Sequence, residues 1–405
     1  AYKRKYFKKL KNKMKNKFPI SYGDHSINSI DIKNINFAIK RKKLTSGPIL
    51  EKLEINLKKY LKVKNALVCS SGTAALHLAM LSINLKKNDV VIMPAINFVA
   101  AYNVCKLMGA KIFFADVDKF SGQMTPFTIQ KIIKEKKLKK IKVLVSMYMG
   151  GFPENVEKIY DLKKKYKFFL IEDSCHAFGA SIKHKSKTYR IGSCKFSDIA
   201  TFSMHPVKTI TSGEGGIITT NNNSLAKRIR LIRSHGLIRG KKEYWQYFSK
   251  YEGLNYRLSE INCALALGQL KRTNEFIKRR REIYEKYKKK LKNFSNYIFF
   301  PNYQNTQGSS FHLNIIHLNL SSIKGNKDDF IRYLNKFKIF PQYHYIPLYR
   351  LKMVRKVILS NYSGSEKYFL SALSLPIYVN LNNKMITFVI EKIIRYLKKN
   401  KKKNV

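Results

Sequence analysis

Residues 198–219 read D-I-A-T-F-S-M-H-P-V-K-T-I-T-S-G-E-G-G-I-I-T, and this stretch decides how the rest of the chain is interpreted. An apolar run that ends at Ser203 and a β-branched run at 217–220 predict two strands separated by a glycine-rich turn. Lys208 lies between them. Burial lowers the pKa of a lysine toward the range in which its amine forms a Schiff base, so a reactive amine is one interpretation. A surface lysine on the turn is the alternative, because the chain is rich in lysine.

Strands and helices alternate in the sequence before this stretch. Apolar strand-like runs, separated mostly by helical stretches of about ten to fifteen residues, lie at 66–69, 90–93, 111–117, 143–147 and 168–172. This order predicts an α/β fold, with a mostly parallel sheet sandwiched by helices and with ligands at the carboxyl ends of its strands. We expect a basic N-terminal arm, a large domain, a smaller C-terminal α/β domain and a basic tail, at residues 1–17, 18–272, 273–397 and 398–405 respectively.

Three loops at predicted strand ends carry residues that could bind a ligand. The first, 70–75, opens a helix, and its small residues let backbone N–H groups approach a phosphate, although an ordinary N-cap would look the same. The second offers Phe98, either as a stacking ring or as a core residue. The third, 172–177, sets Asp173 at a buried strand end with His176 nearby, where a ligand or a structural salt bridge could pair with the carboxylate.

Together with Lys208, these loops supply a phosphate cradle, a stacking ring, a carboxylate and an amine. A pyridoxal phosphate site needs a lysine for the Schiff base, an acid at the pyridine nitrogen, a contact on the ring face and a phosphate anchor. The joint pattern therefore favours a pyridoxal phosphate site over four unrelated structural features.

The charge of the chain is its most unusual bulk property. The 405 residues include 80 Lys+Arg and 25 Asp+Glu, a net charge of +55 that is typical of proteins that bind nucleic acid or anionic membranes. The excess is spread along the chain without a zinc-finger, RNA-reading or basic-zipper motif, so we expect no nucleic-acid partner and no metal. The five scattered cysteines and the lack of a long apolar run predict a cytoplasmic protein without a membrane span.

Longer motifs around these loops resemble the DegT/DnrJ/EryC1/StrS family of sugar aminotransferases, a branch of the fold-type I pyridoxal phosphate enzymes. The resemblance covers roughly residues 20–395 in the family's order, and it is carried by SSGTAALHLA (70–79), NFVAAYN (97–103), IEDSCHAFGA (171–180), TFSMHPVKTITSGEGG (201–216) and GLNYRLSEI (253–261). Within the family, the chain is most similar to the branch that works in pseudaminic acid synthesis, through SYGDHSI (21–27), LTSG (44–47), HPVK (205–208), RSHG (233–236) and QYHYIPLY (342–349).

The resemblance also implies which residues form the site. Lys208 and Asp173 are implied as catalytic residues, with Lys208 binding the cofactor through a Schiff base and Asp173 pairing with its pyridine nitrogen. The other implied cofactor contacts are His176 at the phenolic oxygen, Phe98 on the ring face, Gly72, Thr73 and Ser203 at the phosphate, and Asn255 at the cofactor phosphate of the partner subunit in a homodimer with shared active sites. The implied nucleotide-sugar contacts are Tyr22, Lys43, Leu44, Thr45, His344, Tyr345, Ile346 and Pro347.

Three residues depart from the family's pattern. Met204 replaces the usual Phe, and Asn97 and Tyr102 replace the commoner Thr or Ser and Ala. These departures bear on substrate preference more than on chemistry.

The implied activity is the transfer of an amine from L-glutamate to the C4 ketone of a UDP-linked 4-keto-6-deoxy-N-acetylhexosamine, for pseudaminic acid or a related surface sugar. A GDP-perosamine-type or other nucleotide-sugar aminotransferase is the alternative. A sugar dehydratase of the same fold is disfavoured, because that branch carries His at the position of Lys208. A non-catalytic basic protein would instead be colourless and would bind DNA in a salt-sensitive manner.

Overall fold

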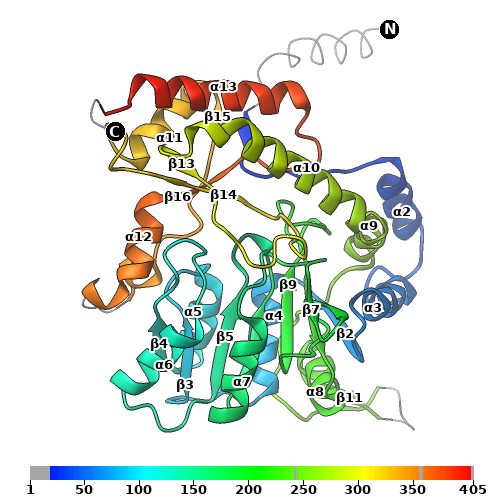
Figure 1. The fold of residues 1–405 in the computed structure, drawn as a ribbon. Helices are drawn as coiled ribbons and strands as arrows, with labels where there is room; N and C mark the ends of the chain where they lie inside the picture. Colours follow the sequence, from blue (N-terminus) through cyan, green and yellow to red (C-terminus); the bar gives the residue numbers. More distant parts are fainter. Residues whose placement is uncertain (1–18, 241–242, 244, 355–358, 403–405) are drawn as a thin grey trace, which may run out of the picture.

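The computed structural model describes residues 19–240, 243, 245–354 and 359–402. The predicted basic arm at 1–17 lies outside the described residues, as does the end of the predicted tail. Figure 1 shows a large sheet with its helices in the lower part of the view and a smaller group of helices and short strands above it.

A seven-stranded sheet forms the centre of the larger part, with the strand order β2-β10-β9-β6-β5-β3-β4. β10 is antiparallel to both of its neighbours, and the other pairs are parallel. The predicted α/β fold with a mostly parallel sheet is therefore confirmed. The strands are β2 (Asn65–Cys69), β3 (Val90–Pro94), β4 (Lys111–Ala115), β5 (Val143–Met147), β6 (Phe169–Asp173), β9 (Ile199–Ser203) and β10 (Gly216–Thr220).

Helices cover both faces of this sheet (Figure 1). Within β5, Val143 and Val145 belong to the core on one face and Leu144 to the core on the other. Because both faces are buried, each strand is a continuous apolar run, which is why the sequence locates these strands closely. One face packs against α4 (Gly72–Ser82), α5 (Val99–Leu107) and α8 (Asn223–Ile232). The other packs against α3 (Pro48–Leu61), α6 (Pro126–Glu135), α7 (Val156–Tyr166) and α9 (Glu260–Lys271), and α2 (Ser29–Ile39) lies against α9.

The chain after α9 builds the smaller part around a three-stranded antiparallel sheet, β13-β14-β16. The first described strand, β1 (Ile20–Ser21), joins this part by pairing in parallel with β15 (Ile339–Phe340). β15 is only two residues long, since Pro341 lacks the N–H that would continue the pairing. The remaining elements are α10 (Thr273–Leu291), β13 (Ile298–Phe299), β14 (Asn314–Leu318), α11 (Lys327–Asn335), α12 (Ser363–Ser371), β16 (Ala372–Leu375) and α13 (Asn383–Lys399). The division at 18–272 and 273–397 stays a prediction.

Two hairpins were not expected from the sequence. They are β7 (Ser181–His184) with β8 (Lys187–Arg190), and β11 (Leu237–Arg239) with β12 (Tyr247–Ser249). Lys185 and Ser186 make the first turn with φ of +44° and +66°, values that such turns usually give to Gly or Asn. Short 3-10 turns lie at η1 (Met149–Gly151), η2 (Lys292–Phe294), η3 (Leu348–Arg350) and η4 (Leu359–Tyr362).

Candidate active site

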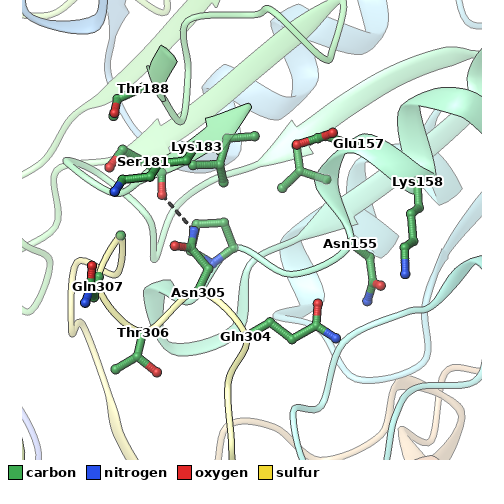
Figure 2. A pocket seen from close by; sticks show the side chains of 14 residues that line it. Asn155, Glu157, Lys158, Ser181, Lys183, Thr188, Gln304, Asn305, Thr306 and Gln307 are labelled. Carbon is green, nitrogen blue, oxygen red and sulfur yellow. Dashed lines mark hydrogen bonds between the residues drawn. The ribbon is translucent and has the colours of Figure 1, made fainter. Parts of the chain in front are cut away.

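Two hollows are candidates for the functional site. The larger, of about 720 Å³, lies between the start of α7, the β7–β8 hairpin and the loop at 304–308 (Figure 2). Half of its 14 lining residues carry amide or hydroxyl side chains. The dashed line in Figure 2 marks the bond from Asn305 Nδ2 to the Ser181 carbonyl, at 2.8 Å. None of the residues predicted for the site lines this hollow.

The second hollow, of about 520 Å³, lies at the carboxyl ends of β6 and β9 and brings most of the predicted site together. Tyr22, Gly72, Thr73, Phe98, Asp173, His176, Ser203, Lys208, His344, Tyr345 and Ile346 all line it. This hollow, here called the lysine cavity, is therefore the candidate active site. It lies where an α/β sheet is expected to bind its ligands.

Lys208 lies in the turn after β9, and its N–H donates to the His205 carbonyl at 2.9 Å. Burial lowers the pKa of the Lys208 amine, while the Cys175 thiol and the Asp173 carboxylate act in the opposite direction. A lowered pKa increases the fraction of neutral amine, the form that attacks a carbonyl. Lys208 is partly buried and lines the cavity, so it is not an exposed lysine on the turn.

Asp173 ends β6, and its side chain is 4% exposed. Burial raises the pKa of Asp173, whereas hydrogen bonds from Cys175 and the positive charge of Lys208 lower it. The Cys175 N–H donates to Asp173 Oδ1 at 3.3 Å and fixes one carboxylate oxygen. A buried carboxylate with a single amide partner has capacity for a cationic ligand group, such as a protonated ring nitrogen.

The N-terminus of α4 forms a cradle for an anion. Ser71 is the N-cap, and its side chain accepts the Ala74 N–H at 3.1 Å. Gly72 opens the helix directly beside Ser203, so closely that a Cβ at Gly72 would lie 2.8 Å from the Ser203 Cβ. Without a side chain Gly72 packs closely against Ser203, so the helix N-terminus, Thr73 and Ser203 line the same cavity, where an anion could bind.

Aromatic rings and histidines line the side of the cavity toward the smaller part. Phe98 is 52% exposed, so it is available as a stacking ring and is not a core residue. Its ring centroid lies 5.7 Å from that of Tyr345. The ring of His344 packs against Tyr22 at 4.9 Å, and burial lowers the pKa of His344 to about 3.

His176 joins this wall through a hydrogen-bond chain that fixes its tautomer. The Gly150 N–H donates to His176 Nδ1 at 3.4 Å, so Nδ1 carries no proton. Burial, together with Lys208 and His344, holds the pKa of His176 well below its usual range, so the ring is neutral and its proton is on Nε2. Nε2 then donates to the Tyr345 hydroxyl at 2.8 Å. The hydroxyl hydrogen of Tyr345 remains available to a ligand.

Five predicted residues do not line the lysine cavity in this chain. Thr45 pairs with Ser259, and the Leu44 carbonyl accepts the Glu260 N–H. Asn255 pairs with Ser234 at an exposed position. Lys43 and Pro347 also lie outside the cavity walls.

Several residues of the cavity were missed from the sequence. They include Met147, Glu214, His312 and Leu351. His312 is 2% exposed, and its Nδ1 has no hydrogen-bond partner among the described residues. It precedes β14 in an apolar run, so nothing in the local pattern separates it from a core residue. Among the described residues, no group of three or more His, Cys, Asp or Glu could hold a metal ion, and no helix has the length and apolarity to cross a membrane.

Comparison with known proteins assigns the class that this fold and site define. The profile of the DegT/DnrJ/EryC1/StrS aminotransferase family matches residues 25–394, and the chain belongs to this family. It is a pyridoxal phosphate-dependent nucleotide-sugar aminotransferase. The resemblance described from the motifs is thus confirmed, together with the predicted cofactor and fold class.

Individual relatives narrow the comparison. The UDP-4-amino-4,6-dideoxy-N-acetyl-beta-L-altrosamine transaminase of Campylobacter jejuni strain 81-176 is 32% identical over 385 residues, which cover 95% of this chain and 99% of that protein. The GDP-perosamine synthase of Escherichia coli O157:H7 is 36% identical over 247 residues, 61% of this chain and 64% of that protein. The structure of Helicobacter pylori PseC, an aminotransferase involved in the biosynthesis of pseudoaminic acid, matches with a TM-score of 0.84 at 28% identity and covers 94% of this chain and 100% of that one.

The residues of the lysine cavity fit the cofactor. The amine of Lys208, the buried carboxylate of Asp173 and the exposed ring of Phe98 line one cavity. The N-terminus of α4, at Gly72 and Thr73, opens into the same cavity beside Ser203, as a phosphate group requires. The charge or polarity of each of these residues suits the cofactor group that it would contact.

Proposed function

We propose that the chain transfers an amine from L-glutamate to the C4 ketone of a UDP-linked 4-keto-6-deoxy-N-acetylhexosamine, on a route to pseudaminic acid or a related surface sugar. The observation that carries the proposal is the position of the Lys208 amine beside Asp173, in a cavity walled by His344 and Tyr345. The long match to the Campylobacter jejuni transaminase supports the UDP-linked sugar.

When bound, the cofactor supplies an aldehyde that carries the amine and a ring that accepts electrons. Asp173 would keep the pyridine nitrogen protonated, because its buried carboxylate favours a cationic partner. Lys208, as a neutral amine, would move the proton between the amino-acid Cα and the cofactor. Gly72, Thr73 and Ser203 would bind the phosphate, and Phe98 would stack on the ring.

A homodimer with shared sites is part of the proposal. Asn255 does not line the cavity of its own chain, which agrees with a role in the site of a partner subunit. Helix α2 exposes large apolar side chains that a second copy could cover, at Ile30, Ile32, Phe37 and Ile39. Lys43, Leu44 and Thr45 would then contact a nucleotide sugar across the same interface. A cytoplasmic location stays a prediction.

GDP-perosamine synthesis is the second candidate, because the match to the Escherichia coli enzyme has the higher identity, although over a shorter length. Incubation of the purified protein with glutamate and matched UDP- and GDP-linked 4-keto sugars would separate the two candidates, with products identified by mass and NMR. We expect amination of the UDP-linked N-acetylated sugar. A preference for the GDP-linked sugar would overturn the proposal.

Replacing Lys208 with Ala should abolish turnover and the visible absorbance of the bound cofactor, since no other amine of the described chain lines the cavity. Lys195→Ala, an exposed lysine of the same segment, is the matched control. Near-normal transamination by the Lys208→Ala variant would contradict the assignment.

A further inference from the structure

Asn97 carries a buried amide of which only the oxygen is hydrogen-bonded within the described residues. It lies between β3 and α5, lines the lysine cavity and is 1% exposed. Its Oδ1 accepts the Phe98 N–H at 2.7 Å. A backbone N–H only donates, so the oxygen of the amide must face it and the orientation of the amide is fixed. The other end, Nδ2, has no hydrogen-bond partner among the described residues.

An unpaired buried donor is costly. It forfeits its hydrogen bonds to water and gains none from the protein, which destabilises the folded state. A ligand oxygen in the cavity would remove that cost when it binds.

The surroundings of Asn97 indicate which ligand it meets. The Leu348 N–H donates to the Ala95 carbonyl at 2.8 Å, which joins the loop of Asn97 to the segment that follows Tyr345. Phe98 contacts the Tyr345 ring on the same side. The family resemblance implies nucleotide-sugar contacts in that segment, at Ile346 and Pro347. The amine and carboxylate proposed for the amino-acid reaction, Lys208 and Asp173, come instead from the turn after β9 and from the end of β6.

We propose that Asn97 is a specificity-determining residue that donates a hydrogen bond from Nδ2 to an acceptor oxygen on the hexose, either an acetamido carbonyl or a ring hydroxyl. The inference rests on the proposed function. A site built around a buried donor rejects substrates that lack the matching acceptor, because the donor would stay unpaired.

Asn97→Asp tests this with almost no change in shape. The variant keeps an oxygen for the Phe98 N–H and replaces the donating Nδ2 with a second acceptor. We expect kcat/KM for the 4-keto sugar to fall about 10- to 100-fold or more, while the single-turnover reaction with glutamate changes by less than about threefold. Asn97→Thr restores a hydroxyl donor and should lose less, which also covers the case of an Asp variant that folds poorly. Asn302→Asp, an exposed amide outside the cavity, is the control.

Two sugars distinguish the sources of the acceptor oxygen. If kcat/KM of Asn97→Asp falls only with the 2-acetamido sugar, the acceptor is the acetamido carbonyl. If it falls equally with the 2-hydroxy analogue, the acceptor is a ring hydroxyl. Unchanged kcat/KM for both sugars, or an equal loss in the glutamate reaction, would overturn the role of Asn97 and leave the proposed function intact. If the wild-type protein aminates none of the sugars, the proposed function fails, and calorimetric binding of the UDP-sugar to wild type and Asn97→Asp decides the inference by itself.

Discussion

Replacing Gly72 with Ala should weaken cofactor binding without unfolding the protein. The new Cβ would lie 2.8 Å from the Ser203 Cβ, whereas ordinary contacts begin at 3.4 Å, so α4 and β9 must separate by about 0.6 Å. Overpacking of this kind costs about 1–3 kcal/mol. If the phosphate cradle at the N-terminus of α4 is displaced and cofactor binding loses that free energy, the dissociation constant of pyridoxal phosphate rises roughly 5- to 150-fold.

The measurement is a titration of apoprotein with pyridoxal phosphate, followed by absorbance and paired with a thermal melt of the apoprotein. Gly23→Ala is the matched control, because it lies next to the cavity residue Val207 and its Cβ would meet the Val207 Cβ at 3.5 Å, an ordinary contact. We expect the control to bind the cofactor like wild type. Wild-type affinity in Gly72→Ala would refute the cradle, and a melt lowered with unchanged affinity would make Gly72 a packing residue only.

Three further changes test other parts of the structure. Burial raises the pKa of Glu172 from 4.5 to about 7, so the unfolded chain loses this proton at a lower pH than the folded protein does, and the folded protein loses stability as pH rises from 4.5 to 7. Gln does not ionise, so the stability of Glu172→Gln should gain up to ~3 kcal/mol over wild type across this pH range, as urea denaturation would measure. Arg280 is 1% exposed and donates to the His312 and Ile377 carbonyls. Arg280→Ala should therefore lower the free energy of unfolding by about 2–4 kcal/mol. The exposed Lys278→Ala is the comparison and should lower it by less than about 0.5 kcal/mol. Tyr345→Phe leaves the His176 Nε2–H without its acceptor and should raise KM for the sugar about tenfold, with the glutamate reaction as the comparison.

The sequence predicts the sheet and the core of the site for a common reason. Strands buried on both faces are apolar throughout, and the residues that follow them, such as Gly72, Asp173 and Lys208, break that pattern at the sheet edge where ligands bind. Lys208 by itself is ambiguous in the sequence, and the joint set of loops favours a reactive amine. The structure places Lys208 and Asp173 in the same cavity.

The remaining parts depend on contacts between distant segments. His312 looks like a core residue in sequence, and only the approach of β14 to the sheet turns it toward the cavity. Asn97 departs from the family pattern, but its unpaired Nδ2 follows from the Phe98 N–H that fixes the amide. The β7–β8 hairpin was missed because its turn residues, Lys185 and Ser186, adopt positive φ, and the sequence lacks the glycine that usually indicates such a turn.

The pairing of β1 with β15 makes the cavity one of the last parts of the protein to be completed during synthesis. Ile20 pairs with Ile339, and the Tyr22 carbonyl accepts the Ile377 N–H, so Tyr22 gains its neighbours only after more than three hundred further residues have been made. At about 5–20 residues per second, that interval is roughly 15–65 s. The N-terminal segment must wait in the meantime, while the large sheet can already form. A ribosome that stops before residue 339 therefore makes a chain that contains every strand of the large sheet but lacks His344, Tyr345 and Ile346 of the lysine cavity.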